Sequence, residues 1–239
     1  MYASLKPIFL LADSQLLFWR DGEGNRFLDR ARQLIAADAP EKRPAAAYLG
    51  ASNGDAPEFF DLFVAAMAEI GIHDCRHILS RPGDEDFAYL EQADLILLAG
   101  GDARRGWEVF VETGLKEKLA ASYYAGSLLV GVSAGAVQLG LKGWDEDGSN
   151  LFDALCLVPF VIDAHDEPSW SRLLRAVART GENARGFGIR SGGGALYHPD
   201  YSIEPVREPL AEVTLGEDGP RQSLLFPGSG EAPTDGPVN

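Results

Sequence analysis

A serine stands at the end of an apolar run, in a spacing that could make it a nucleophile. Leu128 to Val132 predicts a buried strand, and the chain runs on into Gly131-Val-Ser-Ala-Gly135. This G-x-S-x-G pattern is typical of a sharp strand-to-helix turn that lifts one serine above the edge of a sheet. Glycine tolerates the backbone angles of so tight a turn, where larger flanking side chains would collide. The pattern predicts Ser133 as a nucleophile, with a tight packing turn as the alternative.

A serine hydroxyl becomes a nucleophile when a nearby base takes its proton, and histidine is the usual base. The chain contains 4 histidines. His165 follows an apolar run, Leu155 to Ile162, that predicts a strand. His73 and His77 lie before the elbow on a different predicted strand, and His198 comes late in the chain. His165 is therefore the preferred general base, with an ordinary histidine at a strand end as the alternative.

A glycine pair follows a further apolar stretch, Asp94 to Leu98, that also predicts a strand. The pair opens the segment Gly100-Gly-Asp102. At the carboxyl end of a parallel strand, such a pair lets the backbone approach a ligand closely. Arg104 and Arg105 come directly afterwards. They predict either a solvated helix start or a clamp for a carboxylate.

The overall composition excludes several classes of function. The formal net charge is −15 and the pI is near 4.6, which argues against binding to nucleic acid or to an anionic membrane. The two cysteines, Cys75 and Cys156, lie too far apart to indicate a disulfide framework or a metal site. No apolar stretch is long enough to span a bilayer, and the run from Ile8 to Ala12 is too short for a signal peptide. We expect a soluble cytoplasmic protein without a metal or an organic cofactor.

The order of predicted elements indicates the fold class. Strands alternate with helices up to Thr180, which predicts an α/β fold with a mostly parallel sheet covered by helices on both faces. Short strand-like pieces then extend the sheet at one edge: Gly186 to Ile189, Ala195 to Tyr197, Glu212 to Leu215 and Ser223 to Phe226. We expect one domain over residues 1–226 and a mobile tail over residues 227–239.

One predicted helix carries several aromatic side chains. It begins near Pro57 and stops at Gly71. Phe59, Phe60 and Phe63 recur on it at helical spacing. Such a stripe is more often core than a ligand site, so we expect these three rings to pack inside.

The motifs together resemble a known family. Gly131-Val-Ser-Ala-Gly-Ala136, the earlier Leu-Leu-Ala-Gly-Gly-Asp102 and the block from Phe152 to His165 look like the dipeptidase E and cyanophycinase family of serine peptidases. The resemblance spans about Lys6 to Leu196 in the right order and spacing. It implies a fold similar to class I glutamine amidotransferases, with serine where those enzymes carry cysteine.

The resemblance also implies roles for individual residues. Ser133 corresponds to the nucleophile and His165 to the general base. The backbone N–H groups of Gly101 and Ala134 correspond to the oxyanion hole. An orienting acid is expected as well, but Gly188-Ile-Arg-Ser-Gly192 stands where relatives carry it.

Two places in the chain offer a replacement carboxylate. Asp163 shares a strand face with His165, because residues two apart on a strand point the same way. The acidic run Asp145-Glu-Asp147 could fold back over the pocket, and Asp147 is favoured within it. We therefore expect Asp147 or Asp163 to orient the imidazole of His165.

These observations predict a serine-type peptidase or amide hydrolase acting on small, acidic peptides. Asp102, Arg104 and Arg190 are the expected substrate-binding residues, and a homodimer is left open. The alternative is a member of the family that binds a small anionic ligand or a protein partner without turnover. Arg190, in place of the acid, is the feature that favours this alternative.

Overall fold

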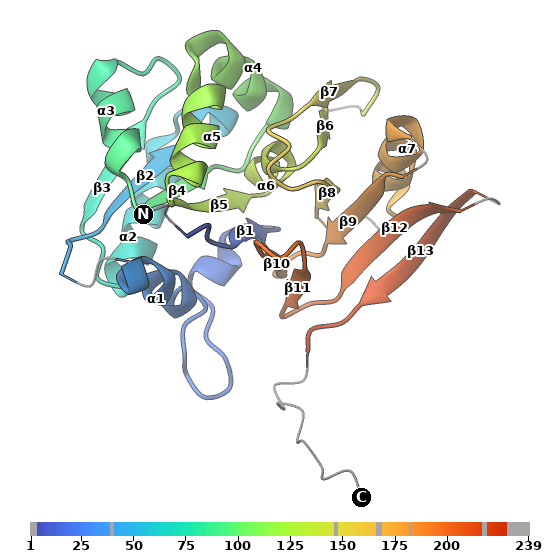
Figure 1. Cartoon of the computed structure of the whole chain (residues 1–239), viewed down its shortest axis with the longest axis horizontal. Coiled ribbons are helices and arrows are strands. Elements are labelled where there is room, and N and C mark those ends of the chain that lie inside the picture. Colours follow the sequence, from blue (N-terminus) through green and yellow to red (C-terminus); the bar gives the residue numbers. More distant parts are fainter. Residues whose placement is uncertain are drawn as a thin grey trace, which may run out of the picture.

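The computed structural model describes residues 4–38, 41–145, 148–165, 169–181, 183–216 and 219–228. Its largest element is a seven-stranded sheet with the strand order β11-β10-β1-β5-β4-β2-β3 (Figure 1). The five strands β1, β5, β4, β2 and β3 run parallel to one another, whereas β10 is antiparallel to both β1 and β11. The strand bounds are β1 Ile8–Leu11, β2 Ala45–Leu49, β3 Asp74–Ile78, β4 Leu95–Leu98, β5 Leu128–Val132, β10 Gly194–Tyr197 and β11 Ile203–Val206.

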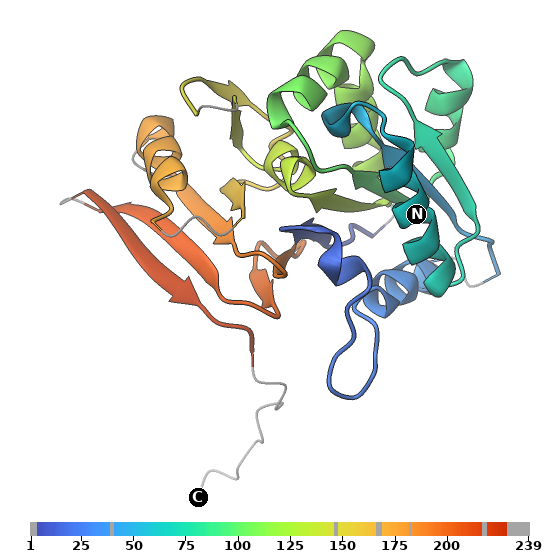
Figure 2. The ribbon, with the colours of Figure 1, turned by 180° about the vertical axis from the view of Figure 1, so that it is seen from behind.

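Helices cover both faces of this sheet, as the sequence predicted (Figure 1, Figure 2). On one face lie η1, α1 and α2, whose bounds are Ser14–Leu17, Asp29–Asp38 and Pro57–Glu69. On the other lie α3 Asp84–Gln92, α4 Ala103–Thr113, α5 Leu115–Tyr124 and α6 Ala134–Leu139. A short helix, η2 Ala51–Asn53, follows β2. No helix among the described residues is both long and apolar enough to cross a bilayer.

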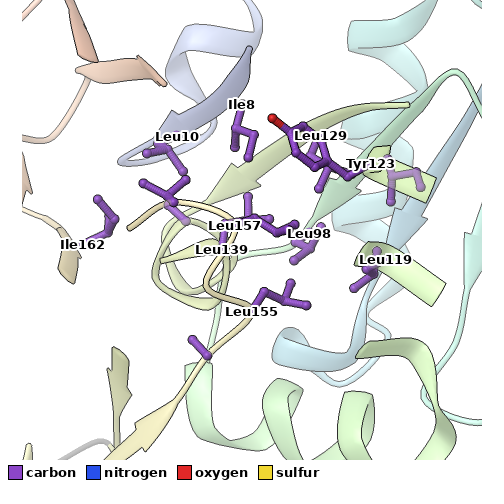
Figure 3. Packing of buried hydrophobic residues seen from close by; sticks show 14 of the residues in the cluster. Ile8, Leu10, Leu98, Leu119, Tyr123, Leu129, Leu139, Leu155, Leu157 and Ile162 are labelled. Atoms are coloured by element: carbon purple, nitrogen blue, oxygen red, sulfur yellow. The ribbon is translucent and has the colours of Figure 1, made fainter. Parts of the chain in front are cut away.

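The alternation of side chains along each central strand divides the core into two layers. Ile8 and Leu10 of β1 pack in the cluster under α4, α5 and α6, part of which Figure 3 shows. Phe9 and Leu11 of the same strand pack in the cluster under α1 and α2. Because both faces are buried, the strands are continuous apolar runs, and this made them recognisable in the sequence.

A second sheet corrects the expectation for the late strands. It has the order β13-β12-β9-β8, and its members are β8 Val161–Ala164, β9 Arg185–Ile189, β12 Leu210–Gly216 and β13 Gly219–Leu225. Only β10, of the late pieces predicted, extends the central sheet. The physical reason is α7, Ser171–Thr180, whose apolar face forms a third core cluster with side chains of β8 and β12. The prediction of a single domain over residues 1–226 stays a prediction, and most of the tail predicted over residues 227–239 lies outside the described residues.

The sequence predicted one strand over the apolar run from Leu155 to Ile162, and this prediction is wrong. The first half of the run is an irregular segment, and β8 begins only at Val161. The backbone N–H groups of Leu155 and Val158 donate to carbonyls in the last turn of α6. Burial against α6 therefore accounts for the apolar residues without a strand. A small hairpin precedes this segment, made of β6 Lys142–Trp144 and β7 Leu151–Asp153.

The connection from β5 to α6 requires glycine on both sides of Ser133. A Cβ added at Gly131 would lie 2.6 Å from the backbone N of Ala136. A Cβ added at Gly135 would lie 2.1 Å from the carbonyl oxygen of Leu98 on β4. The obstacles are backbone atoms, which cannot move aside cheaply. The turn is therefore as tight as the two glycines indicate.

We expect Gly135→Ala to lower the free energy of unfolding by about 1–3 kcal/mol, the usual cost of overpacking. Urea unfolding followed by circular dichroism measures it. Gly22→Ala is the matched control, because its Cβ would meet no atom within 4 Å. A Gly135→Ala protein as stable as the wild type would show that α6 does not press against β4 as described.

Candidate active site

Ser133 occupies the junction between β5 and α6 in a strained backbone conformation. Its φ of 50° and ψ of −110° are unusual for a residue with a side chain. The surrounding backbone holds it there: its N–H donates to the carbonyl of Leu11 at 2.8 Å. Its own carbonyl accepts from the N–H groups of Ala136 and Val137. Strain of this kind persists where neighbouring structure fixes it, and such positions cluster at functional sites.

The second sheet places a histidine against this serine. His165 follows β8, and its backbone N–H donates to the carbonyl of Ile189 at the end of β9. Its Nε2 lies 2.5 Å from Oγ of Ser133. This distance allows the imidazole to accept the hydroxyl proton directly. The two residues that the sequence singled out are thus in hydrogen-bond contact, 32 positions apart in the chain.

The protonation of His165 is set by its surroundings. Partial burial lowers the pKa of the imidazole below its ordinary value of 6.5, because the charged form loses water. The Asp13 carboxylate raises this pKa, and the Arg172 guanidinium lowers it further. The net direction is downward, so the ring is neutral near pH 7 and able to accept a proton.

Two backbone N–H groups flank Ser133, those of Gly101 and Ala134. Within the described part of the chain, neither donates a hydrogen bond to another protein group. Gly101 has a φ of 131°, and a Cβ there would lie 2.2 Å from the carbonyl oxygen of Ser52. Glycine is therefore required at this position, and Gly101, Ser133 and Ala134 line the same cavity. Two available donors beside a nucleophile are what an oxyanion hole needs.

Two cavities meet at Ser133, His165 and Gly101. The first, of about 300 Å³, is called here the polar cavity, because it is lined by Asp102, Trp144, Asp145, Asp163 and Arg172. The second, of about 280 Å³, is called the apolar cavity, because it is lined by Leu17, Phe59, Leu62, Phe63, Leu97 and Val132. Among the described residues, no three His, Cys, Asp or Glu side chains gather in a way that could hold a metal ion.

The carboxylates expected to orient His165 either line the polar cavity without bonding its ring or lie outside the described residues. Asp163 is 2% exposed, and its Oδ1 lies 3.7 Å from a guanidinium nitrogen of Arg172. Asp145 lines the polar cavity and accepts hydrogen bonds from Asn150. Asp147 lies outside the described residues. Across the described ranges, no carboxylate accepts a hydrogen bond from the His165 ring.

Asp13 is the charged neighbour that the sequence reasoning missed. It follows β1, which lies beside β5 in the sheet, so it ends near Ser133. Its carboxylate accepts hydrogen bonds from the backbone N–H groups of Gln15, at 2.9 Å, and Gly192, at 2.7 Å. It lines the apolar cavity together with His165. The signal available in the sequence was its place directly after the first predicted strand.

The expected substrate-binding residues are distributed differently. Asp102 lines the polar cavity and caps α4, accepting from the backbone N–H groups of Arg104 and Arg105. The Arg104 side chain pairs with Glu108 at 2.7 Å. Arg190 directly follows β9, and its Nε is buried with no hydrogen-bond partner among the described residues. Neither Arg104 nor Arg190 lines either cavity.

Comparison with known proteins gives consistent findings. Residues 16–200 match the model of peptidase family S51. An uncharacterized peptidase of Bacillus subtilis (strain 168), YgaJ, is 25% identical over 117 residues, which are 48% of this chain and 49% of that protein. The match thus spans about half the length of this curated relative.

Solved structures of two peptidases share the fold. One, from an acI-B1 actinobacterium, has a TM-score of 0.66 at 12% identity and covers 94% of this chain and 96% of that one. The other, assigned as a peptidase E from Listeria monocytogenes EGD-e, has a TM-score of 0.60 at 14% identity. It covers 85% of this chain and 99% of its own.

We expect the protonation midpoint of His165, followed by NMR, to lie below 6.5. Asp13→Asn removes a charge that favours the imidazolium, so the midpoint should fall further. Arg172→Gln removes a charge that disfavours it, so the midpoint should rise. His165→Ala identifies the resonance. Shifts of the same sign in both variants would contradict the arrangement of charges around this ring.

Proposed function

Because this chain belongs to peptidase family S51, we propose that it is a serine-type peptidase that hydrolyses small peptides with Ser133 as its nucleophile. The observation that carries the proposal is the 2.5 Å contact between Oγ of Ser133 and Nε2 of His165 at a strained strand-to-helix turn. The sequence motifs indicated a resemblance to the dipeptidase E and cyanophycinase family, and the match to peptidase family S51 confirms this resemblance.

The reaction follows from the positions of these groups. Ser133 Oγ attacks the peptide carbonyl while His165 Nε2 takes the hydroxyl proton. The carbonyl oxygen becomes an anion, and the N–H groups of Gly101 and Ala134 donate to it. His165 then gives its proton to the leaving amine, and water hydrolyses the acyl-enzyme by the same steps in reverse. One oxyanion donor typically contributes about 10²–10³ in rate.

The imidazolium that forms during attack needs a compensating negative charge. We assign this role to Asp13, which raises the pKa of His165 and is held in place by the N–H groups of Gln15 and Gly192. Asp13 acts through space, since it does not hydrogen-bond the ring. Asp163 is the less suitable group, because Arg172 lies next to its carboxylate.

The charges of the polar cavity bear on the expected acidic substrate. Its described lining contains one cation, Arg172, and the three carboxylates of Asp102, Asp145 and Asp163. An acidic side chain would therefore meet more repulsion than attraction there. The proposed substrate is a small peptide, with no acidic residue required.

The alternative of a binding protein without turnover depended on Arg190. That alternative needs the guanidinium to fill the space beside Ser133. Arg190 lines neither of the two cavities there, and His165 occupies the position of a base. Hydrolysis is therefore the function that the site supports best.

We expect Ser133→Ala and His165→Ala each to lower peptide hydrolysis about 10³- to 10⁴-fold or more, the usual loss for a member of a catalytic triad. Release of free amine from a panel of dipeptides and tripeptides measures it. His73→Ala is the matched control, because His73 is exposed and directly precedes β3, the edge strand of the central sheet, which is separated from β5 by β2 and β4. Hydrolysis that survives His165→Ala unchanged, or a panel that the wild type does not cleave at all, would overturn the proposal.

A further inference from the structure

The apolar cavity opens directly onto the proposed nucleophile, yet the reaction steps do not use it. Ser133, His165 and Gly101 are among the residues that line it. The rest of its wall comes from η1, η2, α2 and the ends of the central strands. A group that enters this cavity would therefore lie immediately next to the carbonyl that Ser133 attacks.

One helix face supplies most of the apolar wall. Phe59, Leu62 and Phe63 are three and four positions apart on α2, so they share a face. Phe63 is 1% exposed, as expected for the core. Phe59 and Leu62, by contrast, are 47% and 43% exposed. The expectation that Phe59 packs inside is thus wrong, because its side chain borders the open cavity instead of the core.

The side chains that line the apolar cavity disfavour the binding of an acidic substrate group. Its described lining contains no lysine and no arginine. Its one carboxylate, Asp13, already accepts hydrogen bonds from Gln15 and Gly192. Burial raises the pKa of Tyr48, which also lines the cavity, to about 12, so this side chain stays neutral. An acidic group would be repelled by Asp13 without a cation to compensate.

We infer that the apolar cavity binds a large apolar side chain, such as leucine or phenylalanine, of the substrate residue next to the cleaved bond. This inference rests on the proposed peptidase function. The volume of about 280 Å³ suits a single side chain rather than a long segment. Occupation would cover the exposed parts of Phe59 and Leu62, and removing that apolar surface from water favours binding.

The first experiment measures binding without turnover. Ser133→Ala is titrated by NMR with two dipeptide series, X-Ala and Ala-X, in which X is alanine, leucine, phenylalanine or aspartate. In one of the two series, leucine and phenylalanine should bind about tenfold more tightly than alanine, since apolar pockets discriminate strongly by size. Aspartate should bind no better than alanine. The same preference should appear in kcat/KM of the wild type.

A second substitution ties the preference to the cavity. Leu62→Asp, combined with Ser133→Ala, should abolish the advantage of leucine and phenylalanine. Leu62 is 43% exposed, so the change costs little stability. Leu224→Asp is the matched control, because Leu224 is 46% exposed and lies on β13, in the other sheet. It should leave the preference intact.

The outcomes separate this inference from the proposed function. If the wild type cleaves peptides but binding does not depend on the size of X, the inference about the cavity is overturned and the peptidase stands. The same holds if Leu62→Asp leaves the preference unchanged. If apolar peptides bind preferentially but the wild type cleaves none of them, the peptidase is overturned and the cavity remains an apolar binding site. If no peptide binds, the inference falls as well.

Discussion

The position of one oxygen atom, Oγ of Ser133, depends on how closely the backbone of the elbow packs against its neighbouring strands. The N–H of Ser133 is fixed by β1 through the carbonyl of Leu11. On the other side, Gly135 lies so close to the carbonyl of Leu98 on β4 that a Cβ has no room. Both contacts involve backbone atoms, so they leave little freedom for the turn. The strained backbone at Ser133 persists because β5 is held between its two neighbours in the sheet, β1 and β4.

The groups of the proposed reaction lie at strand ends that come from two different sheets. The central sheet contributes Asp13 after β1, the glycine pair after β4 and Ser133 after β5. The second sheet contributes His165 after β8. Ligand sites of open α/β sheets generally lie at the carboxyl ends of strands, where loops are free to vary. Here the contact between Ser133 and His165 also joins the two sheets across that edge.

What could be predicted from the sequence was local. The elbow at Ser133 and the buried strands around it follow from glycine spacing and from apolar runs, which depend on neighbouring residues. The extent of β8 could not be predicted, because α6 buries part of the same apolar run. The proximity of Asp13 to His165 and the exposure of Phe59 depend on tertiary packing, which no local pattern encodes. The sequence shows that Asp13 follows a predicted strand, but it does not show that His165 lies near Asp13.

The central claim is that His165 activates Ser133 as a nucleophile, while the two backbone donors stabilise the oxyanion. Reaction with a small fluorophosphonate, followed by mass spectrometry of the digested protein, tests this most directly. We expect one adduct, located on Ser133. The Ser133→Ala variant should form no adduct, and the His165→Ala variant should form it much more slowly than the wild type. Equal modification of the wild type and Ser133→Ala, or modification of neither, would contradict it.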